Sequence, residues 1–262
     1  MEKRKVNSDI LVVKVGTSTL TYPKTGKLNL KRLDVLTRIL CDIKNSGKKV
    51  VLVSSGAIGV GMSKLGMSER PKSIKEKQAV AAVGQCELMS IYDRLFSEYG
   101  TIVAQILLTK DVITNEERNE NVINTFNTLL SKGIIPIVNE NDSISVDEIK
   151  FGDNDTLSAL VSGLVKADTL IILSDIDGLY DKNPREHKDA KMIHTVESID
   201  KKIENMAEGA GTKAGTGGMI TKIRAAKLAT ENNIDVIIAN GEDPHILYDI
   251  IDGEEIGTIF RH

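Results

Sequence analysis

Short runs of apolar, mostly β-branched residues alternate along the chain with longer segments in which apolar residues recur at helical spacing. The segment 30–44, for example, has apolar residues at Leu33, Leu36, Ile39, Leu40 and Ile43. The apolar runs predict strands over 10–15, 50–53, 101–107, 134–138, 170–173, 236–238 and 256–260. The periodic segments predict helices over 30–44, 74–99, 116–132, 157–165 and 220–231. Continuously apolar strands separated by helices indicate an α/β fold with a mainly parallel sheet covered on both faces.

Two segments do not fit this alternation. Residues 146–151 are short and mixed in polarity, and we expect them to form a hairpin outside the central sheet. Residues 206–218 are rich in Gly, Ala and Thr without periodicity, and we expect a mobile loop there. No composition shift marks a domain boundary, so residues 1–262 are predicted to form a single domain.

Composition and charge narrow the class of protein. The chain has 262 residues, 41% of them hydrophobic and 27% charged, which is typical of a globular protein. A net charge of −3 gives no electrostatic reason to expect nucleic-acid binding. The start is basic but lacks the apolar core of a signal peptide, and no apolar run is long enough to span a membrane, so we expect a cytoplasmic protein. Cys41 and Cys86 form no disulfide or zinc pattern, and we expect two buried thiols.

Polar or small residues follow the first two strands. Lys14 comes two residues before Gly16, in an otherwise apolar strand. Such a lysine is costly to bury unless an anion accompanies it, although a lysine of an edge strand could reach water instead. The small residues of Ser54-Ser55-Gly56-Ala57 lead into a helix, where backbone N–H groups can approach an anion; alternatively, glycine is required only by the turn.

Two further polar clusters contain carboxylates and amides. Asn139-Glu140-Asn141-Asp142 follows a strand and suits a zwitterionic small molecule, unless it is a solvated loop. Asp153, Asn154 and Asp155 precede the helix over 157–165, where acidic residues commonly act as caps. Because one cap does not require two Asp and an Asn, the surplus could orient cations.

A glycine loop over 215–218 opens the next helix, and Lys222 lies near its start. Such a start favours phosphate, although the Walker A pattern is absent. Two lysines, two glycine turns and an acidic helix start together indicate phosphoryl transfer. With a carboxylate as acceptor no general base is needed, because the group is already ionised.

Seven ordered motifs resemble the amino acid kinase family, and within it the members that phosphorylate glutamate: VVKVGTSTL, VSSGAIGVG, AAVGQ, VNENDSI, KFGDNDTLSAL, LSDIDGLY and GTGGMITK. The resemblance runs from Leu11 to Phe260. It implies a three-layer α/β/α sandwich around a mainly parallel eight-stranded sheet. It also implies that ATP, with Mg2+, phosphorylates the side chain of L-glutamate to L-glutamyl 5-phosphate, the first step of proline biosynthesis.

The resemblance assigns roles to residues. Lys14 and Lys222 would stabilise the transferring phosphoryl group, and Asp155 would orient both lysines. Glutamate would be bound by Ser55, Asp142 and Asn154, with Asn139 and Asp153 nearby. The nucleotide would be bound by Lys14, Ser174, Asp175, Thr216, Gly217, Gly218, Met219, Ile220, Thr221 and Lys222. No residue is predicted to bind a metal directly.

Other consequences of the resemblance are a homo-oligomer, dimer or tetramer, and feedback inhibition by proline near the glutamate pocket. Many members carry a C-terminal PUA domain, which we expect this chain to lack because it stops at His262. Two alternatives remain open from the sequence. One is a related kinase acting on aspartate, N-acetylglutamate or carbamate, and the other is a non-catalytic sensor of glutamate, proline or nucleotide.

Overall fold

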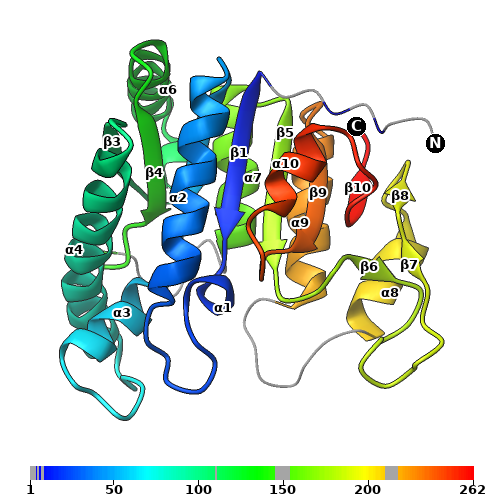
Figure 1. Ribbon diagram of the computed structural model, residues 1–262, viewed down its shortest axis with the longest axis horizontal. Helices are drawn as coiled ribbons and strands as arrows, with labels where there is room; N and C mark the ends of the chain where they lie inside the picture. Colours follow the sequence, from blue (N-terminus) through cyan, green and yellow to red (C-terminus); the bar gives the residue numbers. More distant parts are fainter. Residues whose placement is uncertain (1–3, 5, 7–8, 110, 145–153, 210–217) are drawn as a thin grey trace.

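The computed structural model describes residues 4, 6, 9–109, 111–144, 154–209 and 218–262. Figure 1 shows how its elements are arranged. The strands are β1 Ile10–Val15, β2 Lys49–Val53, β3 Val103–Leu108, β4 Ile135–Glu140, β5 Thr169–Ser174, β6 Leu179–Tyr180, β7 Met192–Ile193, β8 Thr195–Val196, β9 Asp235–Asn240 and β10 Thr258–Phe260. The helices are α1 Thr17–Leu20, α2 Leu30–Asn45, α3 Ala57–Lys64, α4 Ile74–Glu98, α5 Asp111–Thr114, α6 Glu116–Ser131, α7 Asn154–Val165, α8 Lys201–Gly209, α9 Met219–Thr230 and α10 Ile246–Ile251.

Eight strands form the central sheet, in the order β3-β4-β2-β1-β5-β9-β10-β8. The β9–β10 pair is antiparallel, and the other pairings of this sheet are parallel. The mainly parallel sheet expected from the sequence is therefore confirmed. Parallel pairing brings the carboxyl ends of β1, β2, β4, β5 and β9 to one edge, which is where open α/β sheets bind ligands.

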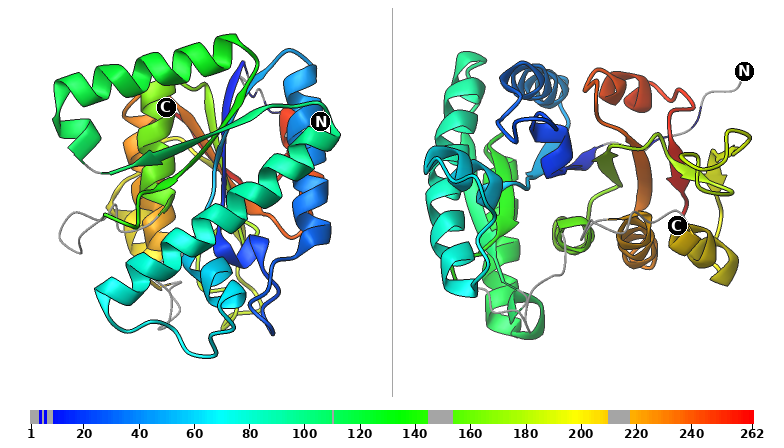
Figure 2. Two further views of the ribbon diagram at one scale, coloured as in Figure 1. Left: turned by 90° about the vertical axis from the view of Figure 1, so that its left-hand side faces the viewer. Right: turned by 90° about the horizontal axis from the view of Figure 1, so that it is seen from below.

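Helices cover both faces of the sheet, so the expected three-layer sandwich is also confirmed (Figure 2). The alternation of side chains along β1 shows how one strand serves both layers. Leu11 and Val13 belong to the core cluster that includes buried residues of α2, α4 and α10. Val12 belongs to the cluster that includes residues of α6, α7 and α9. In the described part of the chain, no helix combines the length and apolarity needed to cross a bilayer.

Helices α3 and α4 pack with their backbones in direct contact, which two glycines permit. A Cβ atom on Gly84 of α4 would lie 1.7 Å from the Ala57 carbonyl oxygen, and one on Gly61 of α3 would lie 2.0 Å from the Val80 carbonyl oxygen. Gly56, at the N-cap of α3, has φ +99°, a left-handed conformation that favours glycine. The close crossing holds the start of α3 against α4 at the carboxyl edge of the sheet.

Most predicted elements are found within a few residues of their expected bounds. β4 runs two residues further than predicted, so Asn139 and Glu140 belong to the strand and are buried. The loop predicted over 206–218 is wrong for Met206–Gly209, which completes α8, and its residues 210–217 lie outside the described residues. The hairpin predicted over 146–151 lies outside them too.

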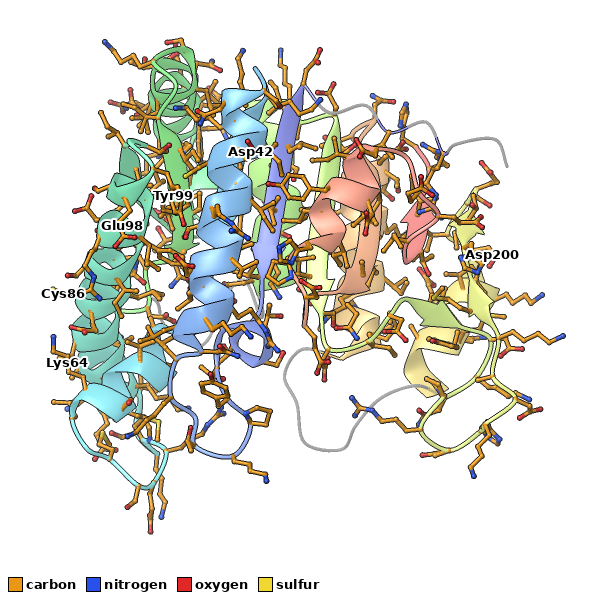
Figure 3. The ribbon with its side chains drawn as sticks, in the orientation of Figure 1. Asp42, Lys64, Cys86, Glu98, Tyr99 and Asp200 are labelled. Atoms are coloured by element: carbon orange, nitrogen blue, oxygen red, sulfur yellow. The ribbon has the colours of Figure 1, made fainter. Side chains whose placement is uncertain are left out.

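The prediction of two buried thiols is wrong for one of them. Cys41 is buried in α2, whereas Cys86 is exposed. Figure 3 shows Cys86 on the outer side of α4. Its neighbour Gln85 is turned about 100° away around the helix and accepts a hydrogen bond from Asn139 at the end of β4.

Candidate active site

Three charged side chains from distant segments form a buried cluster at the carboxyl edge of the sheet. Lys14 Nζ in β1 lies 2.5 Å from Oδ1 of Asp155, and Lys222 Nζ in α9 lies 3.1 Å from Oδ2. Their exposed fractions are only 7% for Lys14, 1% for Asp155 and 6% for Lys222. The hydroxyl of Thr221 also donates to Oδ2, at 2.8 Å. One carboxylate therefore holds two ammonium groups in place.

The electrostatics of the cluster favour an anionic ligand. Burial is the largest single influence and acts to raise the pKa of Asp155, but the charges of Lys14 and Lys222, together with hydrogen bonds from Lys14 and Thr221, hold that pKa below its ordinary value. Among the described residues, these two cations share the carboxylate of Asp155 in a poorly hydrated site. An anionic ligand near both ammonium groups would be attracted by their charge and would reduce the cost of burying them.

The position of Lys14 argues against a lysine that merely reaches water. β1 lies between β2 and β5, and Lys14 is in register with Val53 on one side and Ile172 on the other. It is therefore on a central strand rather than on an edge strand. Asp155 likewise differs from a helix cap, because its carboxylate contacts two lysines of other elements.

A network of amides and hydroxyls adjoins the charged cluster. Asn154, the first residue of α7, has its Nδ2 2.6 Å from the Ser54 carbonyl oxygen and 2.9 Å from the Ser55 hydroxyl. The same nitrogen lies 2.9 Å from Oδ1 of Asn139. Asn139 in turn donates to Gln85 of α4, at 2.8 Å. The first turn of α7 thus joins the two parts of the site, because Asn154 donates hydrogen bonds within the network and the adjacent Asp155 pairs with the two lysines of the charged cluster.

A buried tyrosine of α4 contacts this network through the side chain of Ser54. The hydroxyl of Tyr92 in α4 lies 3.0 Å from the Ser54 hydroxyl. Burial raises the pKa of Tyr92 above its ordinary value, because an apolar environment disfavours the charged form of the hydroxyl. Since the Ser54 carbonyl accepts from Asn154, Tyr92 contributes to the placement of the first turn of α7.

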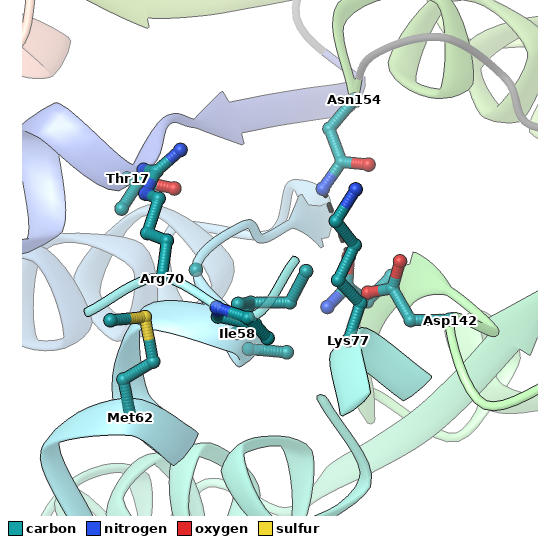
Figure 4. Close-up of a pocket in the computed structure, with 12 residues that line it drawn as sticks. Thr17, Ile58, Met62, Arg70, Lys77, Asp142 and Asn154 are labelled. Carbon is teal, nitrogen blue, oxygen red and sulfur yellow. Dashed lines mark hydrogen bonds between the residues drawn. The ribbon is translucent and has the colours of Figure 1, made fainter. Parts of the chain in front are cut away.

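A cavity of about 220 Å³ opens beside the network (Figure 4). It is lined by Thr17, Gly56, Ala57, Ile58, Gly59, Met62, Arg70, Pro71, Lys77, Asn139, Asp142 and Asn154. The lining thus combines one carboxylate, two cations, two amides and the start of α3. Such a mixture of opposite charges suits a small zwitterion.

A second cavity, of about 460 Å³, lies where β5 ends. Ser174 and Asp175 line it together with Ser18, Arg32 and Arg185. Asp175 is exposed and forms an ion pair with Arg185 at 3.2 Å. Apart from Lys14, which belongs to the charged cluster, the described residues predicted to bind nucleotide therefore fall into two groups, one at the end of β5 and one at the start of α9.

The second of these groups comprises Gly218, Met219, Ile220, Thr221 and Lys222. Gly218 is the N-cap of α9 and, as a glycine, has no side chain with which to cap this helix start. Thr221 and Lys222 both contact Asp155, so this group joins the charged cluster. Asp153, Thr216 and Gly217, also predicted to belong to the site, lie outside the described residues.

Several residues of the cavity and of the adjoining hydrogen-bond network were not singled out from the sequence. Gln85 lies in the AAVGQ motif, but a single amide in a helix has no distinctive signal of its own. Arg70 and Lys77 do not follow a predicted strand, and the packing of α3 and α4 brings them to the cavity. Thr17 lies in the VVKVGTSTL motif, just after β1, but no role was predicted for it. Tyr92 has no signal that distinguishes it in the sequence from an ordinary buried residue of a helix.

Comparison with known proteins agrees with this geometry. The model of the amino acid kinase family matches residues 9–240. A glutamate 5-kinase of Clostridium perfringens is 62% identical over 99% of this chain and 98% of that protein. A glutamate 5-kinase of Clostridium acetobutylicum is 56% identical over 99% of this chain and 97% of that protein.

A solved structure shows the same fold at much lower identity. UMP kinase from Bacillus anthracis has a TM-score of 0.65 and 15% identity, covering 97% of this chain and 96% of that chain. At this identity the likeness concerns the fold alone. Since the family model spans most of the chain and relatives above half identity cover nearly all of it, the chain belongs to the amino acid kinase family.

Proposed function

We propose that this chain transfers the γ-phosphoryl group of ATP to the side-chain carboxylate of L-glutamate, giving L-glutamyl 5-phosphate and ADP, the first step of proline biosynthesis. The observation that carries the proposal is the buried carboxylate of Asp155 between two lysines, beside a cavity with zwitterion-binding groups. The similarity to two glutamate 5-kinases along nearly the whole chain supports the choice of substrate.

The charged cluster addresses the main difficulty of this reaction, which is the approach of two anions. At about 4 Å and an effective dielectric constant of about 20, two unit negative charges repel by roughly 4 kcal/mol. Lys14 and Lys222 would offset this repulsion and stabilise the charge on the phosphoryl oxygens in the transition state. Asp155 would orient both ammonium groups. An oxygen of the substrate carboxylate attacks the γ-phosphorus as the bond to ADP breaks, and no proton has to be removed.

The cavity beside Asn154 would hold the amino acid. Asp142 would bind the ammonium group, while Asn154 and Ser55 would bind and aim the side-chain carboxylate. Asn139 would hold Asn154 in place and lies at the same cavity. We propose Asp153 as an additional neighbour of glutamate, on the resemblance alone.

ATP would lie between the end of β5 and the start of α9. Ser174 and Asp175 would contact one end of the nucleotide, and Thr216, Gly217 and the helix start from Gly218 to Lys222 would contact the phosphates. Helix starts with free N–H groups favour phosphate oxygens. Lys14 would meet the phosphoryl group from the β1 side.

An ATP-dependent kinase generally requires Mg2+. Among the described residues, no three His, Cys, Asp or Glu side chains come together as a metal site. The carboxylate of Asp155 is already shared by two lysines. We therefore propose that Mg2+ enters with the phosphate oxygens of ATP rather than in a site of the protein's own side chains.

Three further properties of the chain are proposed on the resemblance. Residues 1–262 would act as a single kinase domain in the cytoplasm. The chain would form a dimer or a tetramer, which size-exclusion chromatography with light scattering would measure. Proline, which shares the ammonium and α-carboxylate groups of glutamate, would inhibit by competing at the same cavity.

Trapping of the acyl phosphate tests the proposed reaction. Hydroxylamine converts it to a hydroxamate, measured with ATP, Mg2+ and L-glutamate. Aspartate, N-acetylglutamate and a reaction without acceptor serve as controls. Signal with L-glutamate alone would support the proposal, and signal with another acid would replace the substrate. Ligand binding without any product would instead favour a sensor.

A further inference from the structure

The glutamate cavity contains two cations to which the proposed mechanism gives no role, Arg70 and Lys77. L-Glutamate brings three charged groups, of which the side-chain carboxylate and the ammonium group are already assigned. We propose that Lys77 binds the α-carboxylate of L-glutamate and thereby determines specificity for an α-amino acid. This inference rests on the proposed function and identifies the remaining contact of its substrate.

The place of Lys77 in α4 is electrostatically unfavourable by itself. α4 begins at Ile74, so Lys77 lies in its first turn, where the helix dipole favours negative rather than positive side chains. The neighbouring Glu76 satisfies this preference and closes a capping box with Ser73. Lys77 adds nothing to this cap, and its half-buried side chain lines the cavity instead.

Within the ranges that the structure describes, no carboxylate lies within ion-pair distance of Lys77. Other lysines near the protein surface do have such partners. Lys64 pairs with Glu87, and Lys227 pairs with Glu204 at 2.7 Å. A half-buried ammonium group at an unfavourable helix position, facing a cavity, is suited to an anion that comes with the ligand.

The two cations lie on different sides of the cavity. Figure 4 shows Lys77 reaching into the cavity on the side of Asp142 and Asn154, and Arg70 beside Thr17. In glutamate the ammonium group and the α-carboxylate share one carbon atom. A cation for the α-carboxylate must therefore lie near the group that binds the ammonium. With Asp142 in that role, Lys77 meets the requirement better than Arg70 does, and Arg70 is also exposed.

With the α-carboxylate and the ammonium group bound at Lys77 and Asp142, the side-chain carboxylate of glutamate can point toward the charged cluster. Two methylene groups separate it from the α-carbon, which allows it to reach Asn154 and, next to it, the cluster around Asp155. Lys77 and Asp142 would fix one end of the substrate while Lys14 and Lys222 act on the other. Lys77 is accordingly a binding and positioning residue rather than a catalytic one.

A comparison of two substrates tests this assignment. L-Isoglutamine keeps the ammonium group and the side-chain carboxylate of glutamate but has a neutral amide in place of the α-carboxylate. The variants are Lys77→Gln, Lys77→Arg and, as a matched control, Lys75→Gln, which changes an exposed lysine of the same helical turn. Hydroxamate formation gives kcat and KM, and calorimetry gives the Kd for glutamate directly.

We expect Lys77→Gln to raise KM and Kd for L-glutamate by about tenfold or more, because a contact between charged groups is lost, with a much smaller change in kcat. The preference of the wild type for L-glutamate over L-isoglutamine should fall by a similar factor. Lys77→Arg should keep most of this preference, and Lys75→Gln should keep all of it. Lys77→Ala serves as a second neutral variant if Lys77→Gln does not fold.

An unchanged KM and an unchanged preference in the neutral variants would overturn the role of Lys77 while leaving the proposed reaction intact. If the wild type binds L-glutamate but makes no acyl phosphate, the proposed reaction fails, and the Kd values still decide the role of Lys77. A wild type that neither binds nor phosphorylates L-glutamate would overturn both.

Discussion

The carboxylate of Asp155 lies 3.1 Å from the ammonium group of Lys222, although 67 positions separate the two residues in the chain. The opposite oxygen of the carboxylate lies 2.5 Å from Lys14 Nζ. Because both lysines are buried, their mutual repulsion is only weakly screened, and the carboxylate between them keeps both in fixed positions. In the proposed reaction, this arrangement would present two cations to a phosphoryl group without requiring them to move.

Substitution of Lys222 should affect chemistry more than binding. Lys222→Ala should reduce kcat by at least about a hundredfold, because one of two charges facing the phosphoryl group is lost, while Kd for L-glutamate stays within about threefold. The matched control is Lys227→Ala, since Lys227 is in the same helix but pairs with Glu204 at the surface. Hydroxamate kinetics and calorimetry measure the two quantities. A Lys222→Ala enzyme with the kcat of the wild type would rule out the proposed role.

Asp155 should matter for stability as well as for activity. Asp155→Asn leaves two buried lysines without their carboxylate, which should lower the free energy of unfolding by about 3 kcal/mol at pH 7. Urea denaturation followed by circular dichroism would measure the difference.

The difference in the free energy of unfolding between wild type and Asp155→Asn should depend on pH. The pKa of Asp155 is lowered from the ordinary value of 3.8, so its stabilising effect is complete above that value and is lost as the pH falls through the lower pKa of the folded state. The gap between wild type and Asp155→Asn should therefore stay constant from about pH 7 to about pH 4 and shrink below that. A gap that closes already between about pH 7 and pH 5 would contradict the lowered pKa.

Asp142 should act mainly on substrate affinity. Asp142→Ala removes the carboxylate proposed to bind the ammonium group, and we expect KM for L-glutamate to rise by about tenfold or more with a smaller change in kcat. Ser143→Ala, a change at the next, exposed residue, is the control. An unaltered Kd for L-glutamate in the Asp142→Ala variant would remove Asp142 from the site.

Two glycine substitutions should change stability in opposite directions. Gly84→Ala would place a Cβ atom 1.7 Å from the Ala57 carbonyl oxygen and force α3 away from α4, lowering the free energy of unfolding by about 2 kcal/mol or more. A Cβ atom on Gly163 of α7 would have no neighbouring atom within 4 Å, so Gly163→Ala should raise the free energy of unfolding by roughly 0.5–1 kcal/mol. Thermal unfolding would measure both. Equal effects of the two substitutions would show that the close crossing of α3 and α4 is not required.

The hydrophobic pattern determined the sheet and its main helices, because strands buried on both faces and long amphipathic helices have strong periodic signals. β1 and α2 occur at almost the predicted positions. The short elements β6, β7, β8 and α10 were not predicted, because two to six residues are too few to establish a period. The end of α8 was mistaken for loop because Gly and Ala there mask the helical pattern of the preceding residues.

By itself, the sequence singled out Lys14, Asp155 and Lys222 as candidates for the chemistry, since they are unusual for their surroundings and occur in ordered motifs. Only the tertiary structure decided how they meet. Parallel pairing brings β1 and the start of α7 to one edge of the sheet, and the packing of α9 against α7 adds Lys222. The same holds for Lys77, which lines the cavity, and for Gln85, which accepts a hydrogen bond from Asn139 beside it, because Gly61 and Gly84 let two helix backbones touch. The periodicity that predicts helices and strands depends on residues close together in the chain, whereas the contacts of the site join residues that are far apart in it.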